Sequence, residues 1–421
     1  MELKRRGFLG VALVGASVLA APAVLGSGRP RVVVVGGGSG GATAARHLAM
    51  QSGGAIDVTL VEPSRTYYTC YFSNLALGGV WSFDDLGHSY ANLAAVHGIN
   101  VVHDWAVGVD RDARTVTLAG GGVLPWDRLV LSPGIDFVDG AVPGWDVAAQ
   151  GRMPHAYKGG TQAALLAAQV EGMREGGVFA MVAPPNPYRC PPGPYERISM
   201  VAHVLTQRNP TAKILLVDPK ESFSKQALFE EGWQRHYPGM IERIDPLFGA
   251  DNVSVDPEAM TVDIDGVIEQ VDVCNVIPAQ KAGRIAEVAG LTNDAGWVPV
   301  DPHTMKARAD EAVFVLGDAS QQGDMPKSGY SANSQAKVAV NVIRHELLDT
   351  RLFPARYSNT CWSLIAPDDG VKVGAAYDAT DEKIATRDSF ISQTGEDTDL
   401  RAATFAESIG WYRGITADMF G

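Results

Sequence analysis

Short apolar runs recur along the chain and predict the strands of parallel sheets. Residues 32–35 (VVVV), 178–183 (VFAMVA) and 312–316 (AVFVL) are apolar throughout, as expected of strands buried on both faces. A helix-like segment rich in alanine follows the first and the last of these runs, and another at residues 160–174 precedes the second. The alternation of strands and helices predicts an α/β fold.

The first run opens a dinucleotide-binding motif, RPRVVVVGGGSGGATAARHLA. Gly36, Gly38 and Gly41 form GxGxxG. The first permits a tight turn, the second lets backbone approach a pyrophosphate, and the third lets the helix pack on the strand. Glu62 ends the next strand, in DVTLVEP, where a carboxylate can accept from ribose hydroxyls. A chance glycine cluster is the alternative, but the complete order of elements favours a nucleotide site.

The far end of the chain favours FAD over NAD as the bound nucleotide. The run at 312–316 ends in GD, and Asp318 stands where FAD enzymes of the glutathione-reductase type hold the ribitol and phosphates of the flavin. The other candidate flavin contacts lie in two turns expected at the same site: Gly134 in LVLSPG, and Lys327, Ser328 and Gly329 in MPKSGYSANSQ.

These positions predict two Rossmann-like, dinucleotide-binding-type domains of the glutathione-reductase type and a smaller α+β C-terminal domain. The FAD-binding domain is expected to be discontinuous, over residues 29–139 and 278–350, with the second domain inserted at residues 140–277. Residues 351–421 are expected to cap the flavin and to carry the interface with a partner.

The inserted domain keeps the element order of a nucleotide site but not its chemistry. Its strand is followed by PPNPYRCPPGPYE, then a helix at residues 198–205, then a second strand ending in Asp218. Prolines lack the N–H groups that could bind phosphate, and Gly193 is the one glycine in this loop. We therefore expect that NAD(P)H does not deliver electrons at the usual site. Cys190, in the same loop, becomes a candidate redox thiol.

The four cysteines are far apart and include no CxxC pair, so we predict neither a metal site nor a c-type haem attachment site. Cys361, in NTCWS, is expected in a loop that opens the C-terminal region, and it is the candidate partner of Cys190. A purely structural disulfide between them is the alternative. Cys274 falls in an apolar strand and is expected in the core.

Charge and the N-terminal segment bear on location. The net charge of −13 and a pI near 5.1 make nucleic acid an improbable partner. Residues 1–28 have a basic start with Arg5 and Arg6, an apolar run and small residues near a possible cleavage site. This pattern predicts a twin-arginine-type signal and a periplasmic protein without stable membrane insertion. A transmembrane anchor is the alternative.

At this point several long motifs resemble one family, the flavoprotein subunit of flavocytochrome c sulfide dehydrogenase. The resemblance runs from about residue 31 to residue 421 and rests on TYYTCYFSN, PHAYKGG, YRCPPGPYER, AGLTNDAGW, MPKSGYSANSQ, NTCWS and DMFG. It implies a glutathione-reductase-like fold, FAD held by an 8α-S-cysteinyl link, a redox-active disulfide, and a heterodimer in which a c-type cytochrome subunit carries the haem c.

Residue by residue, the resemblance places the flavin link on Cys70 and the redox disulfide on Cys190 and Cys361. Glu196 matches a carboxylate near that disulfide, although an exposed acid at a helix start is equally expected there. Trp411 matches an aromatic side chain beside the flavin, with ordinary core packing as the alternative. His155 and Lys158 match a motif to which we assign no role.

The implied function is that of a sulfide–cytochrome c reductase. Hydrosulfide would attack one sulfur of the disulfide, leaving a persulfide on one cysteine and a thiolate on the other, which we assign to Cys361. Electrons would then pass through FAD to the cytochrome, and sulfur or polysulfide would leave. Three alternatives stay open: a sulfide:quinone oxidoreductase, a flavin-bearing activator of a sulfur-oxidising complex, and an NADH-dependent disulfide reductase.

Overall fold

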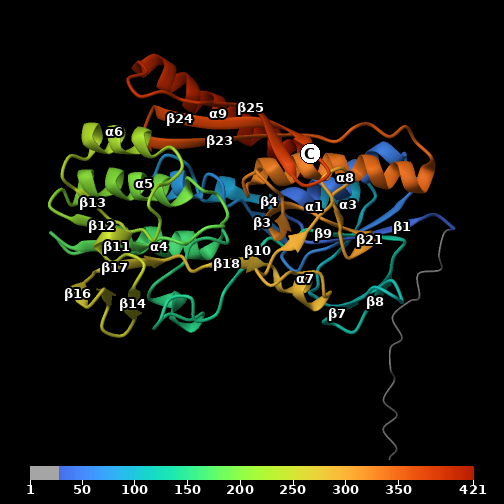
Figure 1. The fold of residues 1–421 in the computed structure, drawn as a ribbon, viewed down its shortest axis with the longest axis horizontal. Helices are drawn as coiled ribbons and strands as arrows, with labels where there is room; N and C mark the ends of the chain where they lie inside the picture. The colour runs from blue at the N-terminus through green and yellow to red at the C-terminus, as the bar shows by residue number, and fades with distance from the viewer. Residues whose placement is uncertain (1–27) are drawn as a thin grey trace, which may run out of the picture.

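The computed structural model describes residues 28–421. The predicted signal at residues 1–28 lies outside the described residues, apart from its last residue, Gly28. Figure 1 shows two lobes side by side, one containing β1, β9 and β21 and the other containing β11 to β13, with the C-terminal elements lying along the top. The fold therefore has three parts, the two lobes and the C-terminal elements.

The first lobe is built on a six-stranded sheet in the order β20-β21-β9-β1-β2-β5. All neighbouring strands are parallel except β20 and β21. Two of the three apolar runs predicted as strands form β1 and β21 inside it. Val32 and Val34 are fully buried there, and α1 packs against α8. The bounds are β1 (Arg31–Val35), β2 (Asp57–Val61), β5 (Asn100–Val102), β9 (Arg128–Leu131), β20 (Lys306–Ala307), β21 (Asp310–Val315), α1 (Ser39–Ser52) and α8 (Gly329–Leu348).

The second lobe is built on a parallel sheet in the order β13-β12-β11-β17. Its helix after the proline-rich loop begins at Gly193, five residues before the predicted start, because Pro194 falls in the first turn, where proline is tolerated. Glu196 therefore lies in the first turn of that helix. The bounds are α4 (Thr161–Glu171), β11 (Val178–Val182), α5 (Gly193–Arg208), β12 (Lys213–Val217), α6 (Gln226–His236), β13 (Ile241–Ile244) and β17 (Val273–Val276).

The C-terminal part is an antiparallel sheet covered by one long helix. It consists of β23 (Arg356–Ala366), β24 (Asp369–Ala379), β25 (Ile384–Ile391) and α9 (Thr398–Phe420). Cys361 lies inside β23, so the prediction of a loop there is wrong. The NTCWS segment pairs residue by residue with β24, with Cys361 opposite Val373, and its residues from Thr360 to Ser363 line the cavity described below.

Smaller elements complete both lobes. They are β3 (Thr66–Tyr68), α2 (Ser73–Leu77), β4 (Gly87–Ser89), α3 (Ala91–Ala95), β6 (Ala106–Asp110), β7 (Thr115–Leu118), β8 (Val123–Pro125), β10 (Ile135–Phe137), β14 (Val253–Asp256), β15 (Thr261–Ile264), β16 (Val267–Gln270), β18 (Gln280–Ala282), α7 (Arg284–Val288), β19 (Val298–Pro299) and β22 (Ser320–Gln321). The predicted α/β class is confirmed.

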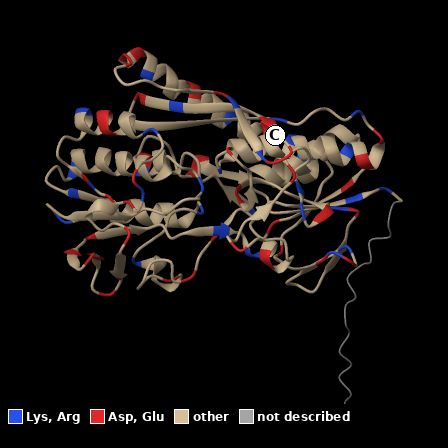
Figure 2. Cartoon of the chain, in the orientation of Figure 1, with Lys and Arg blue, Asp and Glu red and all other residues tan. Residues whose placement is uncertain are grey.

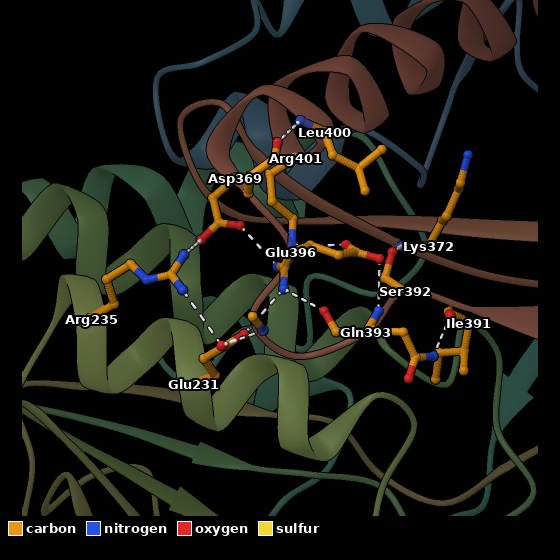
Figure 3. Close-up of polar contacts among 12 residues, drawn as sticks. Glu231, Arg235, Asp369, Lys372, Ile391, Ser392, Gln393, Glu396, Leu400 and Arg401 are labelled. Carbon is orange, nitrogen blue, oxygen red and sulfur yellow. Dashed lines mark hydrogen bonds and ion pairs between the residues drawn. The ribbon is translucent and has the colours of Figure 1, made fainter.

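A buried ion network joins the C-terminal part to the second lobe (Figure 3). The guanidinium of Arg401, on α9, is almost fully buried and pairs with Asp369 at 3.0 Å, Glu231 at 3.1 Å and Glu396 at 3.0 Å. Arg235, on α6, lies 3.5 Å from Glu231 and 3.8 Å from Asp369. The network fixes α9 and β24 against α6, and thereby holds the strand that carries Cys361.

Charged residues of both signs are distributed along the described chain. Figure 2 shows Lys and Arg interspersed with Asp and Glu over both lobes. Among residues 28–421, the helices include none with the length and apolar composition needed to cross a bilayer. In the same part of the chain, His, Cys, Asp and Glu form no group of three placed to hold a metal ion.

Candidate active site

One long cavity runs between the two lobes and beneath the C-terminal sheet. Most of the predicted site residues line it: Gly36, Gly38, Glu62, Cys70, Gly134, Cys190, Glu196, Asp318, Ser328, Gly329, Cys361 and Trp411. These residues come from segments far apart in the chain. The fold thus brings the nucleotide motif and the two candidate thiols into a single space.

The glycine loop at one end of the cavity leaves no room for side chains. At Gly36 the backbone φ is +98°, and a Cβ would lie 2.3 Å from the Ser132 carbonyl oxygen. A Cβ on Gly41 would lie 1.8 Å from the carbonyl oxygen of Gly36, so this glycine serves the packing of α1 and not the cavity wall. The N-terminus of α1 has neither an acidic residue in its first turn nor a side-chain cap. Its free N–H groups suit a phosphate.

Glu62, directly after β2, binds the backbone of this glycine loop. Its carboxylate accepts hydrogen bonds from the Gly37 N–H at 2.9 Å and from the Ser64 N–H at 2.9 Å. The acid predicted to meet a ribose is therefore fixed at the end of β2 and held against the glycine loop.

Two buried, charged side chains line the cavity, and each has a polar atom without a hydrogen-bond partner in the described structure. The guanidinium of Arg189 lies 3.7 Å from the carboxylate of Asp318. Asp318 Oδ1 and Arg189 Nη2 are buried, yet neither has a hydrogen-bond partner among the described residues. Burial raises the pKa of Asp318, and Arg189 and Lys327 counteract that effect. Unpaired buried polar atoms are costly, and the hydroxyls and phosphates of FAD would satisfy them. The residues present fit this cofactor.

Lys327 is placed differently from the other predicted flavin contacts. Its ammonium donates to the carbonyl oxygens of Asp318 and Ser320, each at 2.7 Å, and lies over the ring of Trp297 at 3.7 Å from the centroid. In the described structure it lies behind the cavity wall and supports the loop that carries Asp318. The next residue, Ser328, caps α8 by accepting from the Ser331 N–H at 3.0 Å.

Cys190 and Cys361 face the same space from opposite elements. Cys190 precedes α5 with a positive φ of 57°, and Cys361 lies on β23. Burial raises the pKa of both thiols, and the proximity of Cys361 raises that of Cys190 further. All four cysteines of the chain are unbridged in the structure, so a disulfide between these two stays a prediction. Cys274 is fully buried in β17, as expected of a core residue.

Glu196 reaches the cysteine end of the cavity. One carboxylate oxygen accepts from the Asn74 side-chain amide at 2.8 Å and the other from the Leu364 N–H at 2.9 Å. Burial raises its pKa, whereas Asn74 and Leu364 favour the charged form. Glu196 is thus a partly buried, oriented carboxylate and not the exposed acid of the alternative prediction.

Aromatic side chains cover the remaining wall. Trp411 stacks with Trp362 at 5.3 Å and with Tyr330 at 6.2 Å between ring centroids, and all three line the cavity. Cys70 also lines it, in the turn between β3 and α2. Stacked rings offer a flat apolar wall, which suits a planar cofactor.

The acid that would bind the ribose of a second nucleotide is paired with protein groups instead. Asp218, the acid after β12, is fully buried. It accepts from the Tyr195 hydroxyl at 2.9 Å and pairs with Lys220 at 2.5 Å and Arg243 at 3.2 Å. In a dinucleotide domain this acid is left free for a ribose, so the closed arrangement agrees with the proline-rich loop.

Several residues of the site were missed by the sequence interpretation. Arg189 and Arg197 flank Cys190 and Glu196 in the motif YRCPPGPYER, and that proximity was a usable signal. Arg197 is buried and donates to Asn74 Oδ1 at 3.0 Å and to the Ala156 carbonyl oxygen. The sequence did not indicate Lys225 as a site residue, because it lies in a polar segment before α6 and belongs to none of the motifs.

His155, to which no role was assigned, is buried beside the same arginine. Its Nδ1 accepts from the Tyr157 N–H at 2.9 Å, and burial together with Lys158 and Arg197 lowers its pKa to about 3. The imidazole is therefore neutral at physiological pH and serves the structure of the linker.

Comparison with known proteins gives three matching family models. Residues 163–278 match the central region of the sulfide dehydrogenase [flavocytochrome c] flavoprotein chain, residues 354–420 match the flavin-binding region of flavocytochrome c sulphide dehydrogenase, and residues 30–169 match pyridine nucleotide-disulphide oxidoreductases. The three models together reach all three parts of the fold.

Individual proteins agree with these models. The sulfide dehydrogenase [flavocytochrome c] flavoprotein chain of Chlorobaculum thiosulfatiphilum is 55% identical over 47 residues, which are 11% of this chain and 96% of that sequence. The sulfide-quinone reductase of Aquifex aeolicus is 35% identical over 113 residues, 26% of this chain, and the match spans only 25% of that protein.

The fold has a solved counterpart. The sulfide:quinone oxidoreductase structure from Aquifex aeolicus superposes with a TM-score of 0.71 at 18% identity, covering 92% of each chain. This likeness confirms the predicted glutathione-reductase-like architecture of two Rossmann-like domains and a C-terminal part. The chain belongs to the family of FAD flavoproteins that includes the flavocytochrome c sulfide dehydrogenase flavoprotein chains and the sulfide:quinone oxidoreductases.

Proposed function

We propose that this protein oxidises sulfide, using Cys190 and Cys361 as a redox disulfide beside FAD. The observation that carries the proposal is the shared cavity: both cysteines and Glu196 lie at one end of the space whose other end is the glycine loop. The family models and the relatives named above support sulfide as the substrate.

The chemistry of the cysteines is thiol–disulfide exchange. Hydrosulfide attacks the Cys190 sulfur of the Cys190–Cys361 disulfide, the S–S bond breaks, and its electron pair leaves on Cys361 as a thiolate. A second hydrosulfide displaces the sulfane sulfur as disulfide or polysulfide and leaves Cys190 as a thiolate. Glu196, held by Asn74 and Leu364, is the group placed to take the proton released when the persulfide ionises.

The cofactor would lie along the cavity. The glycine loop, Glu62, Asp318 and Arg189 would hold its polar parts, and Trp411 would lie beside the ring system. FAD held there would supply the two-electron acceptor for the pair of thiolates and the donor of single electrons to a further acceptor. We also propose the 8α-S-cysteinyl link at Cys70. Acid precipitation of the purified protein tests it, because covalently held flavin stays in the pellet.

Anaerobic sulfide titration tests the proposed function. Sulfide should bleach the flavin absorption of the wild-type protein, and Cys190→Ser and Cys361→Ser should each abolish the bleaching while keeping the flavin bound. Cys274→Ala is the matched control, because this thiol lies in the core away from the cavity. Bleaching of Cys190→Ser at the wild-type rate would disprove the mechanism.

We propose a c-type cytochrome subunit as the electron acceptor and partner, and the periplasm as the location. The matches to flavocytochrome c chains support the first, and the twin-arginine pattern at residues 1–28 supports the second. Quinone is the other candidate acceptor, favoured by the likeness to sulfide:quinone oxidoreductases. The reduced protein should be reoxidised by a c-type cytochrome faster than by a soluble quinone analogue. The reverse result would favour the quinone enzyme.

Two other activities are testable with the same protein. An activator without catalytic activity would show no sulfide-dependent reduction of a c-type cytochrome. A disulfide reductase driven by NADH would show flavin reduction by NADH. The buried pairing of Asp218 with Tyr195, Lys220 and Arg243 argues against the latter.

A further inference from the structure

A lysine that the proposed mechanism does not use is buried at the cysteine end of the cavity. The side chain of Lys225 is only about 5% exposed. Its ammonium donates to the Cys361 carbonyl oxygen at 3.1 Å and to Ser363 Oγ at 2.8 Å. A positive φ of 64° turns the chain at this residue, and its own carbonyl oxygen accepts from Leu228 and Phe229 at the start of α6. These contacts fix the side chain of the lysine against β23 and its backbone at the start of α6.

Fold stability alone does not account for this placement. Both hydrogen-bond partners of the ammonium are neutral oxygens, and burying a cation without a counter-charge is costly. Burial lowers the pKa of Lys225 to about 8, while Cys361, Glu196 and Cys190 act in the opposite direction. The side chain thus stays cationic at neutral pH, and no carboxylate of residues 28–421 is in direct contact with it. A negative charge that forms nearby during the reaction would supply the counter-charge that the Lys225 ammonium lacks.

A second donor points at the sulfur of the same cysteine. Asn359 Nδ2 lies 3.4 Å from Cys361 Sγ. The other end of this buried amide, Oδ1, accepts from Ser328 Oγ at 2.6 Å and from Ser331 Oγ at 3.3 Å, and lies farther from Cys361 Sγ, at 3.8 Å. These hydroxyls fix the orientation of the amide, so that its N–H group faces the sulfur.

The surroundings of Cys190 are different. Its backbone N–H donates to the Lys327 carbonyl oxygen at 2.7 Å, and its carbonyl oxygen accepts from the Tyr157 hydroxyl at 3.1 Å. These contacts fix the backbone and leave its sulfur without such a donor among the described residues. Burial, Cys361, Glu196 and Cys70 oppose a negative charge on Cys190, and Lys225 favours it only as the weakest of these effects, whereas on Cys361 Lys225 has the largest effect after burial. The electrostatic environment of the two sulfurs is therefore asymmetric.

We propose that Lys225 and Asn359 are positioning residues that make Cys361 the sulfur that carries the negative charge when the disulfide opens. The inference rests on the proposed function. Hydrosulfide forms a bond to the Cys190 sulfur, its proton stays on the new persulfide, and the electron pair of the broken S–S bond settles on Cys361. The charged and titratable groups that act on Cys361 are Lys225 before α6, Glu196 on α5 and Cys190 in the loop before α5, with Tyr377 across the sheet on β24.

The pH dependence of thiol modification tests the inference without sulfide. The holoprotein is reduced, kept anaerobic, and treated briefly with methyl methanethiosulfonate between pH 6 and pH 10, and the peptides of Cys190 and Cys361 are quantified by mass spectrometry. In the wild type, Cys361 should react at lower pH than Cys190. Lys225→Met should raise the midpoint for Cys361 by about one pH unit, roughly a tenfold slower reaction at neutral pH.

Matched variants separate charge from structure. Lys225→Arg should keep the midpoint of Cys361 close to that of the wild type, and Asn359→Leu should raise it independently of the lysine. Lys220→Met is the control, because Lys220 is an equally buried lysine of the same lobe that pairs with Asp218; it should leave both thiols unchanged. An unchanged midpoint for Cys361 in Lys225→Met, or a wild type in which Cys190 reacts at lower pH, would overturn the inference.

Failure of the proposed function would look different. A wild-type protein whose flavin is not reduced by sulfide would disprove sulfide oxidation, yet the midpoint shift of Cys361 in Lys225→Met would still establish the positioning role. Should Lys225→Met fold poorly, the Asn359→Leu midpoint and the Lys225→Arg comparison decide the question.

Discussion

The side-chain amide of Asn74 donates to the Glu196 carboxylate at 2.8 Å, across the boundary between the two lobes. Asn74 lies on α2 of the first lobe, Glu196 on α5 of the second, and the Leu364 N–H on β23 binds the other carboxylate oxygen. One acid is therefore oriented by all three parts of the fold. Such an arrangement fixes the carboxylate, as the proposed role of proton acceptor requires, and resists movement of the lobes.

Glu196→Gln should slow flavin reduction by sulfide by about 10²-fold or more, because the glutamine keeps the shape of the side chain but cannot take a proton. Rapid-mixing absorption spectroscopy measures the rate. Glu230→Gln, an exposed change on α6, is the control and should have the wild-type rate. A Glu196→Gln protein as fast as the wild type between pH 6 and pH 9 would remove the acid from the mechanism.

The folded protein should lose stability in acid through His155. Its pKa is about 3 in the folded state, against an ordinary value of 6.5. The unfolded chain therefore binds a proton first as the pH falls below 6.5, and stability declines from there toward pH 3. Between pH 7.5 and pH 4.5 the protonation of this residue should lower the free energy of unfolding by about 3 kcal/mol.

Urea unfolding at the two pH values measures that loss. His155→Gln should lose less stability than the wild type over the same interval, since glutamine does not titrate. His303→Gln changes a more exposed histidine and should follow the wild type. An equal loss in His155→Gln and wild type would contradict the assignment.

Arg401→Met should lower the free energy of unfolding by about 3–5 kcal/mol. The substitution leaves Asp369, Glu231 and Glu396 with reduced compensation inside the network of Figure 3. Thermal unfolding followed by circular dichroism provides the measurement. Arg387→Met, which breaks exposed ion pairs on β25, should change stability far less, because solvent screens these pairs. Similar losses in both variants would show that burial of the network is unimportant.

Gly41→Ala should yield a protein with little bound flavin. The added methyl group would lie 1.8 Å from the Gly36 carbonyl oxygen, so α1 must move away from the strand and carry its N-terminus with it. The visible absorption of the purified protein measures the flavin content. Gly410→Ala on α9 is the control, since open space surrounds that position; it should keep the flavin and gain about 0.5–1 kcal/mol of stability. Full flavin content in Gly41→Ala would contradict the assigned role.

The parts of the site that were predictable are those whose chemistry is local in sequence. Gly36 and Asp318 follow apolar strands directly, and strand ends of a parallel sheet meet at one edge, so their convergence could be inferred. The proline-rich loop around Cys190 was equally informative, because missing N–H groups are a property of the residues themselves.

The parts that escaped prediction depend on contacts between distant segments. Lys225 and Asn74 meet the cysteine site only through folding, and neither belongs to a periodic pattern. We predicted a loop around Cys361 because several polar residues lie there, which is typical of an exposed segment. In the structure these residues lie on a strand that lines the cavity and packs against α8. Tertiary burial of polar side chains leaves no trace in the alternation of apolar and polar positions.

The pairing of Tyr195 with Asp218 has a consequence for how this fold can change over evolutionary time. Freeing Asp218 for a ribose would require removal of Tyr195, and the same step would leave Lys220 and Arg243 buried with a disturbed counter-charge. Restoring backbone N–H groups in the loop would require the loss of several prolines as well. A nicotinamide site would therefore need Tyr195 and several prolines replaced together, and replacing Tyr195 alone would disturb the buried pairs of Asp218.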